Sequence, residues 1–213
     1  MSSRAPGPDR LSLLLVGGSG AVGREVLRLA LAEERIERLV APSRRPLPPH
    51  ARLTNPVLDL ATLPDESPYW RVDAVICTLG TTLKQAGSPA AFAAVDRDLP
   101  IRVARCARQA GATRFAFNSS LGASPSGNFY LRTKAEAEAA IGAVGYPSYT
   151  IQWSSSSDTT LACRSGVDSM LLAAHRLDEN VRRVLEPHLL RAADNLVTRL
   201  RSAGGVATQA LNE

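Results

Sequence analysis

Residues 11–23 read Leu11-Ser-Leu-Leu-Leu-Val16 and then Gly17-Gly-Ser-Gly20-Ala-Val-Gly23. The first six residues form a short, almost continuous apolar run, which is typical of a strand buried on both faces of a sheet. The next stretch, from Ala21 to Glu34, carries apolar side chains at helical spacing. A buried strand, a glycine-rich turn and a helix therefore follow one another, which is the first half of a strand–helix–strand unit with a parallel sheet.

The rest of the first two thirds of the chain repeats this alternation. We expect further strands at Ile36–Ala41, more weakly at Arg52–Leu58, and at Val72–Leu79, Arg114–Asn118 and Ser148–Trp153. We expect helices at Pro89–Gln109 and Phe129–Ala143. Parallel crossovers at this spacing predict an α/β fold with a doubly wound, Rossmann-like sheet, in a single domain over residues 10–153.

The pattern changes after Ser154. A serine-rich stretch is followed by a long amphipathic region from about Gly166 to Ala203, interrupted near Pro187. We expect residues 154–213 to form a mainly helical C-terminal segment that packs on the same domain. An apolar stripe of this kind is more often core packing than an oligomer contact, and a homodimer face is the second interpretation.

Composition narrows the class of protein. A chain of 213 residues suits one domain. It contains no run of about 18 apolar residues, so no membrane interaction is expected. Leu11–Val16 is too short for the core of a signal peptide, which makes a cytoplasmic protein the expectation. The three cysteines and three histidines lack the spacing of metal ligands, so we predict no metal and no disulfide.

The positive charge lies in the first part of the chain. Residues 1–150 contain 18 basic and 13 acidic residues, whereas the remainder contains 7 of each. These arginines are scattered among carboxylates and are not clustered with aromatic residues, as nucleic-acid surfaces require. We therefore expect no nucleic-acid partner.

The glycine pattern Gly17-x-x-Gly20-x-x-Gly23 lies directly between the first strand and the first helix. A diphosphate needs backbone N–H groups at close range, and a side chain on the turn would keep it away. Glycines at positions 17 and 20 permit that approach, and Gly23 lets helix and strand pack closely. The pattern predicts a dinucleotide site.

The end of the second strand bears on the choice of dinucleotide. NAD-specific sites usually place an acid there, but this chain continues as Ser43-Arg44-Arg45. Guanidinium groups suit a 2′-phosphate, so NADP(H) is favoured over NAD(H). The alternative is a pair of solvated loop arginines. Asp59, after the third strand, is interpreted either as an acceptor for the adenine amino group or as a helix cap.

Tyr130 and Lys134 are four residues apart on a predicted helix, in a chain with four tyrosines and two lysines. Side chains at this spacing share one helix face. A phenol of pKa about 10 becomes a useful proton donor near neutrality when an ammonium group stabilises its phenolate. Ser119 and Ser120 end the preceding strand, where a hydroxyl could polarise a carbonyl. The alternative for the Tyr/Lys pair is an ordinary exposed helix surface.

Several motifs occur in an order that resembles a known family. They are Gly17-x-x-Gly20-x-x-Gly23, Cys77-Thr-Leu-Gly-Thr-Thr82, Ala94-Val-Asp-Arg-Asp-Leu99, Ser119-Ser-Leu-Gly-Ala123 and Tyr130-x-x-x-Lys134. The chain resembles the atypical short-chain dehydrogenases/reductases, and within them the NAD(P)H-binding proteins similar to the Tat-interacting oxidoreductase-like protein. The resemblance covers about residues 10–152.

The resemblance implies a nicotinamide cofactor lying across the carboxyl ends of the strands. It implies that Thr78 to Thr81 passes beneath the cofactor, and that Tyr130 and Lys134 are catalytic with Ser119, or its neighbour Ser120, beside them. Together with the residue-based interpretation, the expected cofactor-binding residues are Gly17, Ser19, Gly20, Ala21, Val22, Gly23, Ser43, Arg44, Arg45, Asp59, Thr78, Leu79, Gly80, Thr81 and Lys134.

The chain departs from the family after the last predicted strand. Relatives usually continue with an Arg-Pro pair and a loop that helps to enclose the nicotinamide, whereas this sequence reads Ile151-Gln-Trp153-Ser-Ser-Ser-Ser157. The segment is interpreted as a divergent substrate lid or as a region altered relative to the family, even by a shifted reading frame.

These observations favour an NADP(H)-dependent oxidoreductase that acts on a small carbonyl or alcohol substrate by hydride transfer with Tyr/Lys acid–base chemistry. The alternative is a non-catalytic NADPH-binding redox sensor or regulatory protein. Epimerase or dehydratase chemistry on a nucleotide sugar would need a larger substrate domain than the 60 residues after Trp153 usually supply. Fold alone does not decide between them.

Overall fold

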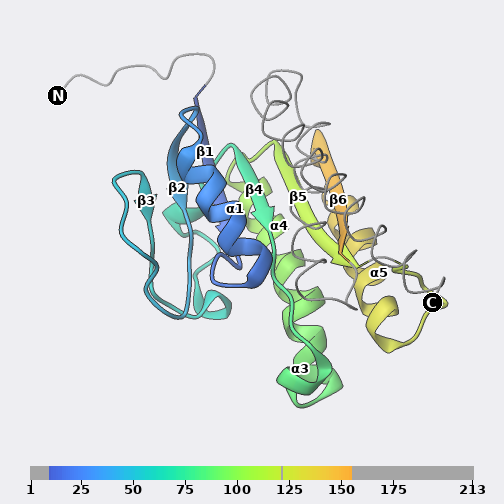
Figure 1. Cartoon of the computed structure of the whole chain (residues 1–213). Helices are drawn as coiled ribbons and strands as arrows, with labels where there is room; N and C mark the ends of the chain where they lie inside the picture. Colours follow the sequence, from blue (N-terminus) through green and yellow to red (C-terminus); the bar gives the residue numbers. More distant parts are fainter. Residues whose placement is uncertain (1–9, 121, 155–213) are drawn as a thin grey trace, which may run out of the picture.

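The computed structural model describes residues 10–120 and 122–154. These residues form a six-stranded sheet of parallel strands in the order β3-β2-β1-β4-β5-β6 (Figure 1). The strands are β1 (Leu11–Val16), β2 (Ile36–Val40), β3 (Leu53–Thr54), β4 (Ala74–Cys77), β5 (Arg114–Ser120) and β6 (Ser148–Ser154). The predicted Rossmann-like parallel sheet is confirmed.

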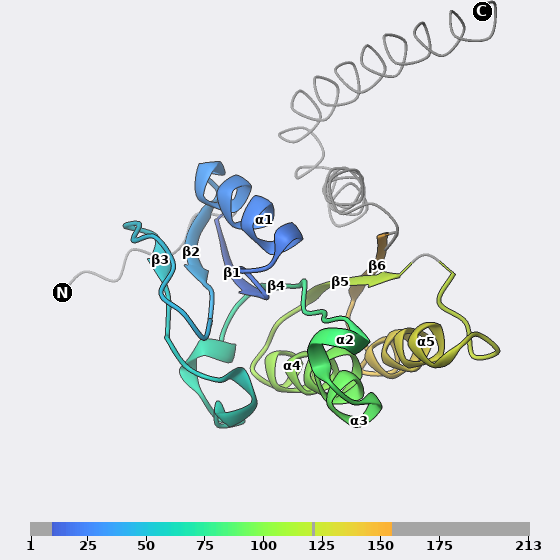
Figure 2. The same ribbon diagram turned by 60° about the horizontal axis from the view of Figure 1, so that its bottom comes forward.

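Helices cover both faces of this sheet. They are α1 (Ala21–Ala32), α2 (Leu83–Ala86), α3 (Pro89–Ala93), α4 (Leu99–Gln109) and α5 (Phe129–Gly142). Figure 2 shows α1 on one face, and α4 and α5 on the other. Short 3-10 turns at Leu60–Thr62 and Pro68–Trp70 lie in the connection that leads to β4.

The continuous apolar run of β1 is explained by its central place in the sheet. Leu13 and Leu15 belong to the hydrophobic cluster on the α1 side. Leu14 and Val16 belong to the larger cluster on the opposite side, which α4 and α5 cover. Successive side chains of a strand point to opposite faces, so a strand with helices on both sides needs apolar residues throughout.

The strand order reverses at β1, which has β2 on one side and β4 on the other. In sheets of this type, ligands bind outside the carboxyl ends of the strands at such a switch point. Val16 is paired with Cys77, so the turn that starts at Gly17 and the segment that starts at Thr78 leave the sheet side by side.

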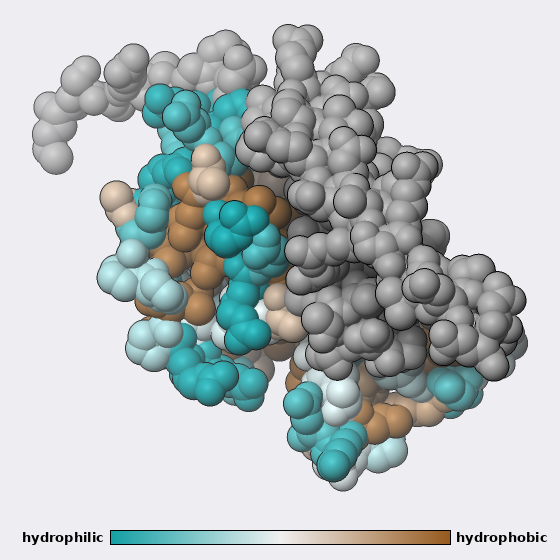
Figure 3. Space-filling model, in the orientation of Figure 1, coloured by the Kyte–Doolittle hydropathy of each residue, from teal (hydrophilic) through white to brown (hydrophobic). Residues whose placement is uncertain are grey.

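The connection from β2 to β3 contains no helix between residues 41 and 52. Instead, Leu47 of the proline-rich loop packs against the cluster on the α1 side, with Leu31 and Leu53 as further partly buried members. Figure 3 shows hydrophobic residues on the surface beside α1, on the side of β2 and β3. A loop thus replaces a crossover helix at this edge of the sheet.

Two parts of the chain differ from or lie beyond the sequence expectation. The helix expected at Pro89–Gln109 is divided by a π-helical turn, Ala94–Asp98, which separates α3 from α4. The expected helical segment at 154–213 lies outside the described residues, apart from Ser154 at the end of β6.

Candidate functional site

The three glycines of the turn occur for different structural reasons. Gly17 has φ +91°, and a Cβ there would lie 2.6 Å from the hydroxyl oxygen of Thr78. A Cβ on Gly23 would lie 2.0 Å from the carbonyl oxygen of Gly17. The protein's own packing therefore requires both of these glycines.

Gly20 is less constrained by the protein's own packing than Gly17 and Gly23. Its φ of −74° and ψ of 173° suit any residue, and a Cβ would meet only the Gly17 carbonyl oxygen, at 3.2 Å. Space that the protein leaves open beside a helix start is what close approach of a ligand needs. The turn thus fits a diphosphate at this position.

Helix α1 begins at this turn with its first amides uncapped by a side chain. Gly20 is the N-cap residue and offers no side-chain acceptor, and the first turn contains no acidic residue. Ala21, Val22 and Gly23 therefore present backbone N–H groups at the positive end of the helix dipole. This arrangement favours an anion, and Ser19 lies in the turn just before it.

The segment after β2 is held in place by Asn55, a residue that sequence reasoning did not single out. Its Nδ2 donates to the carbonyl oxygen of Ala41 at 2.6 Å and to the hydroxyl of Ser43 at 2.7 Å. Its Oδ1 accepts from the amide of Leu47 at 2.9 Å. Ser43 is buried and donates to the carbonyl oxygen of Arg45 at 2.6 Å, so its hydroxyl stabilises the loop.

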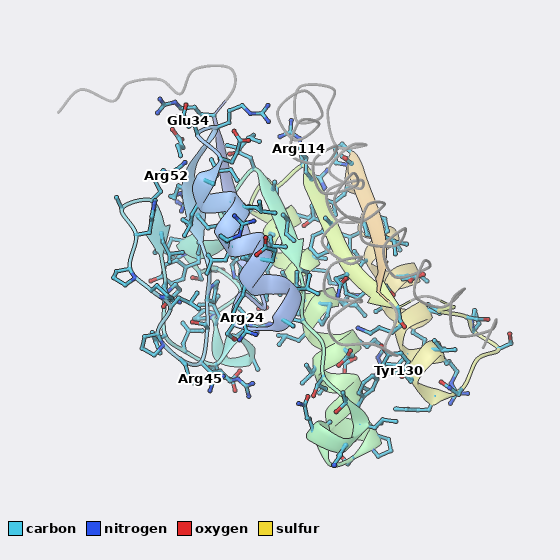
Figure 4. All side chains as sticks on the ribbon, viewed as in Figure 1. Arg24, Glu34, Arg45, Arg52, Arg114 and Tyr130 are labelled. Atoms are coloured by element: carbon cyan, nitrogen blue, oxygen red, sulfur yellow. The ribbon has the colours of Figure 1, made fainter. Side chains whose placement is uncertain are left out.

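Arg44 and Arg45 follow on this ordered loop with exposed side chains. Figure 4 shows Arg45 and Tyr130 near the carboxyl edge of the sheet, toward its two sides, with Arg24 between them. Arg52 and Arg114 lie at the opposite edge (Figure 4). An extended ligand along the carboxyl edge would thus meet cationic groups beyond β2.

Asp59 acts as a local cap in this structure. Its Oδ1 accepts a hydrogen bond from the amide of Ala61 at 2.9 Å, at the start of the turn Leu60–Thr62. Of the two interpretations that the sequence left open, the cap is the one with a contact. A role toward adenine stays a prediction.

Lys134 is buried and forms an ion pair that the sequence did not reveal. Its Nζ lies 2.7 Å from Oδ1 of Asp96, and the side chains are 4% and 1% exposed. The other carboxylate oxygen, Oδ2, accepts from the amide of Thr81 at 2.8 Å. The only sequence signal for Asp96 was its place in the family-like stretch from Ala94 to Leu99. The alternative of an ordinary exposed helix surface does not apply to Lys134.

Charges in this part of the molecule are strongly desolvated. Burial raises the pKa of Asp96, while the Lys134 ammonium and the Thr81 N–H act in the opposite direction. The ammonium also lies 5.6 Å from the ring centroid of Phe117 on β5. A buried carboxyl with a perturbed pKa and a single cationic partner is a common feature of functional sites.

Tyr130 lies one turn before Lys134 on α5 and is half-buried. Its ring packs against Phe92 of α3, with centroids 5.4 Å apart. The helix starts at Asn128, whose side chain accepts from the amide of Leu131 at 3.0 Å, so the cap fixes the first turn that carries Tyr130. Tyr130 and Lys134 are thus brought to the α4/α5 side of the sheet.

Ser119 and Ser120 are both buried at the carboxyl end of β5, within the strand and not after it. Strand alternation places Ser119 on the same face as Phe117, over which the lysine ammonium lies. Ser120 points to the other face. This geometry favours Ser119 as the serine on the side of Lys134.

The segment after β4 lies between the glycine turn and the ion pair of Lys134 and Asp96. Thr78 is buried and contacts the glycine turn, and Leu79 packs partly buried on the core. A Cβ on Gly80 would lie 3.6 Å from Oδ1 of Asp96 and 3.8 Å from Nζ of Lys134. The Gly80 backbone therefore passes next to the ion pair. No metal-binding group of His, Cys, Asp and Glu occurs in residues 10–120 and 122–154.

The sequence of this chain matches a known protein family. The NAD dependent epimerase/dehydratase family matches residues 13–140. The chain belongs to this family. The resemblance drawn from the motifs, to atypical short-chain dehydrogenases/reductases of the Tat-interacting group, is confirmed at this level.

Curated relatives in this family share about one third of the aligned residues. Protein HTATIP2 of Rattus norvegicus is 32% identical over 136 residues, covering 61% of this chain and 56% of that protein. Protein FMP52, mitochondrial, of Debaryomyces hansenii is 30% identical over 141 residues, covering 64% and 62%. Protein fmp52, mitochondrial, of Emericella nidulans is 32% identical over 146 residues, covering 63% and 62%. The chain therefore spans less than two thirds of the length of these relatives.

Solved structures share the fold at low sequence identity. A UDP-glucuronic acid 4-epimerase from Bacillus cereus, solved with UDP-glucuronic acid and NAD, has a TM-score of 0.57 at 11% identity. The match covers 67% of this chain and 55% of that one. MoeE5 with UDP-glucuronic acid and NAD gives 0.56 at 19% identity, covering 65% and 52%.

The relatives correct the expectation of a cytoplasmic location. Several fungal relatives are named as mitochondrial proteins. The expectation of a cytoplasmic location is therefore wrong. The physical reason is that a short apolar run at Leu11–Val16 argues only against the core of a secretory signal, and does not distinguish the cytosol from an organelle. Within the described part of the chain, no helix is long and apolar enough to cross a membrane.

Proposed function

We propose that this chain is an NADP(H)-dependent oxidoreductase that interconverts a small carbonyl compound and its alcohol by hydride transfer. One observation carries the proposal, namely the order of features along the carboxyl edge of the sheet. A glycine turn with open space at Gly20, the exposed pair Arg44 and Arg45, and the Tyr130–Lys134 helix lie along this edge. NAD in the solved structures of the same fold supports a nicotinamide nucleotide here.

The residues at the start of α1, in the loop after β2 and in the segment after β4 would bind the dinucleotide. The amides at the start of α1 would bind the diphosphate, and the space at Gly20 would allow its approach. Arg44 and Arg45 would bind the 2′-phosphate, and Ser43 keeps their loop in place. The segment Thr78 to Thr81 would lie beneath the cofactor, next to Lys134.

The residues on β5 and α5 would position the substrate and transfer the proton. The bound nicotinamide supplies the hydride to the carbonyl carbon, or accepts it in the reverse reaction. Tyr130 would donate its phenolic proton to the carbonyl oxygen as the C–H bond forms, and would recover a proton from solvent. Ser119 would donate a hydrogen bond to that oxygen, and Lys134 would contact the ribose and stabilise the phenolate.

A non-catalytic NADPH-binding sensor is the second candidate. The observation that favours it is the departure from the family after the last strand, where Ile151-Gln-Trp153-Ser-Ser-Ser-Ser157 stands in place of the Arg-Pro segment that helps to enclose the nicotinamide in relatives. We propose a small-molecule substrate and no nucleic-acid or membrane partner.

The decisive experiment begins with the cofactor that the purified protein retains. Mass spectrometry of the released nucleotide, followed by calorimetric titration with NADPH and NADH, tests binding. Oxidation of NADPH against a panel of aldehydes and ketones then tests turnover. NADPH binding with turnover supports the enzyme, and tight binding without turnover on any substrate supports the sensor. A protein that binds neither cofactor would exclude both.

A further inference from the structure

Within residues 10–120 and 122–154, the interior contains a charged contact whose role the proposed reaction does not explain. Lys134 on α5 and Asp96 between α3 and α4 form an ion pair of 2.7 Å with almost no exposure to solvent. Removing two charges from water costs several kcal/mol for each ion, and well-packed apolar residues are often at least as stable in such a place. Stability alone is therefore a weak reason for this pair.

The backbone around Asp96 has an unusual conformation. Residues Ala94–Asp98 form a π-helical turn between two α-helical segments. Such turns insert one residue into a helix and frequently occur at functional sites. Here the turn carries Asp96 into the interior, while its neighbour Arg97 remains half-exposed and pairs with Glu136 of α5 at 2.8 Å.

Asp96 uses its two oxygens for two different parts of the site. Oδ1 contacts the lysine ammonium on α5, and Oδ2 accepts from the Thr81 amide in the segment after β4. A Cβ on Gly80 would be in van der Waals contact with both charged atoms, so the Gly80 backbone passes next to the pair. One carboxylate thus joins the proposed catalytic helix to the segment that would lie beneath the cofactor.

We propose that Asp96 is a positioning residue that fixes the Lys134 ammonium against the Gly80–Thr81 backbone, so that both meet the cofactor ribose as one rigid surface. The inference rests on the proposed function for its ligand, but the fixed position of the lysine is a property of the protein itself. A lysine directed by a buried carboxylate has fewer orientations to lose when the cofactor binds.

The chain offers a direct test of the lysine position without any cofactor. It contains two lysines, Lys134 and the exposed Lys84, so acylation by an amine-reactive acetate ester can be followed at both sites by peptide mass spectrometry. In wild type, Lys134 should react at least about tenfold more slowly than Lys84, because its amine is enclosed and paired. Asp96→Asn keeps the shape and an acceptor for Thr81, but removes the charge. Its Lys134 should react several-fold faster, since a buried ammonium without a counter-charge is disfavoured.

A matched control separates positioning from general helix packing. Glu136→Gln removes the other ion pair between the π-helical turn and α5, and should leave Lys134 reactivity unchanged. Equal reactivity of Lys134 and Lys84 in wild type, or no change in Asp96→Asn, would overturn the assignment. Far-UV circular dichroism checks that each variant is folded.

A double-mutant cycle on NADPH affinity tests the consequence for the cofactor. Asp96→Asn should weaken binding by about tenfold, and Lys134→Met by at least as much. The double variant should bind no more weakly than Lys134→Met alone, because Asp96 acts through the lysine. Additive losses would overturn the inference. If Asp96→Asn does not fold, the double variant lacks the unpaired ammonium, and its affinity compared with Lys134→Met decides the same point.

The proposed function and the positioning role of Asp96 are overturned by different results. A wild-type protein that binds neither NADPH nor NADH overturns the proposed function and the cofactor role of Asp96, while the acylation experiment still decides whether Asp96 fixes Lys134. A wild-type protein that binds NADPH, with unchanged affinity in Asp96→Asn, overturns only the inference.

Discussion

Thr78 donates its hydroxyl hydrogen to the carbonyl oxygen of Val16 at 2.9 Å, and its backbone amide donates to the same oxygen at 2.8 Å. The two contacts join β4 to β1 at the point where the glycine turn begins. The Thr78 side chain also fills the space that a Cβ on Gly17 or Gly23 would need. Two of the three glycines therefore maintain the strand–helix junction, and Gly20 remains available for a ligand.

Gly20→Val should abolish binding of both NADPH and NADH while the protein stays folded. The dihedral angles of Gly20 suit any residue, and the close contact of a Cβ would be with the Gly17 carbonyl oxygen at 3.2 Å, so the new side chain should extend mainly into the ligand's space. Calorimetric titration measures the loss, and a thermal melt checks the fold. Gly18→Ala is the matched control, because its Cβ would make an ordinary contact of 3.4 Å with Leu15. Retained binding in a folded Gly20→Val protein would mean that the turn is structural only.

Arg44→Ala combined with Arg45→Ala should remove a preference for NADPH. Wild type should bind NADPH at least about tenfold more tightly than NADH, which corresponds to about 1.4 kcal/mol for a charge-assisted phosphate contact. The double variant should bind both cofactors about equally, with NADH affinity little changed. Arg105→Ala, an exposed arginine on α4, serves as the control. Equal affinities in wild type would contradict the assignment.

The sheet was predictable from sequence because its central strands are buried on both faces. A run such as Leu11–Val16 has apolar residues on both faces and is therefore favoured where both faces are buried. The glycines after it mark the turn. The β2–β3 connection was less predictable, because Leu47 is held by the side chain of Asn55 across eight residues of a proline-rich loop. Such a contact leaves no periodic pattern in the sequence.

The candidate site was predictable in its parts and not in its connections. Tyr130 and Lys134 could be placed on one helix because their spacing is local. The partner of Lys134 could not, because Asp96 is 38 positions away and reaches the lysine only through a π-helical turn. Propensity arguments predict one continuous helix there, and the tertiary contact decides its actual geometry.

Arg52→Ala should lower the free energy of unfolding by about 1.5–3 kcal/mol, since hydrogen bonds from a charged group to partly buried carbonyls contribute more than neutral ones. The Arg52 guanidinium donates to the carbonyl oxygens of Glu33 and Ile36, each at 2.6 Å, and to that of Leu31. It thereby satisfies acceptors between the end of α1 and the start of β2. Urea unfolding measures the change. Arg28→Ala breaks only an exposed pair with Glu25 and should cost less than about 1 kcal/mol. Similar losses for both variants would contradict this account.

Ser119→Ala and Ser120→Ala should differ in their effect on turnover. Ser119 lies on the face of β5 where Phe117 contacts the lysine ammonium, whereas Ser120 faces the other side. Loss of a hydrogen bond to the reacting oxygen should reduce kcat by about 10²-fold in Ser119→Ala. Ser120→Ala should retain most of the activity. Steady-state kinetics with the best carbonyl substrate measures both, and the reverse order would move the assignment to Ser120.

Tyr130→Phe should reduce turnover by roughly 10²–10⁴-fold, the usual range for loss of a general acid. The substitution removes one hydroxyl and keeps the ring that packs on Phe92, so α5 and Lys134 should stay in place. NADPH affinity should barely change, because the phenolic oxygen adds little to a ligand held by its diphosphate. Tyr149→Phe is the control, since Tyr149 lies opposite Phe115 near the start of β5 and its hydroxyl donates to the carbonyl oxygen of Glu138. That variant should keep full turnover. Single-turnover measurement of NADPH oxidation distinguishes a slow chemical step from weak binding, and a Tyr130→Phe protein as active as wild type would mean that another group supplies the proton.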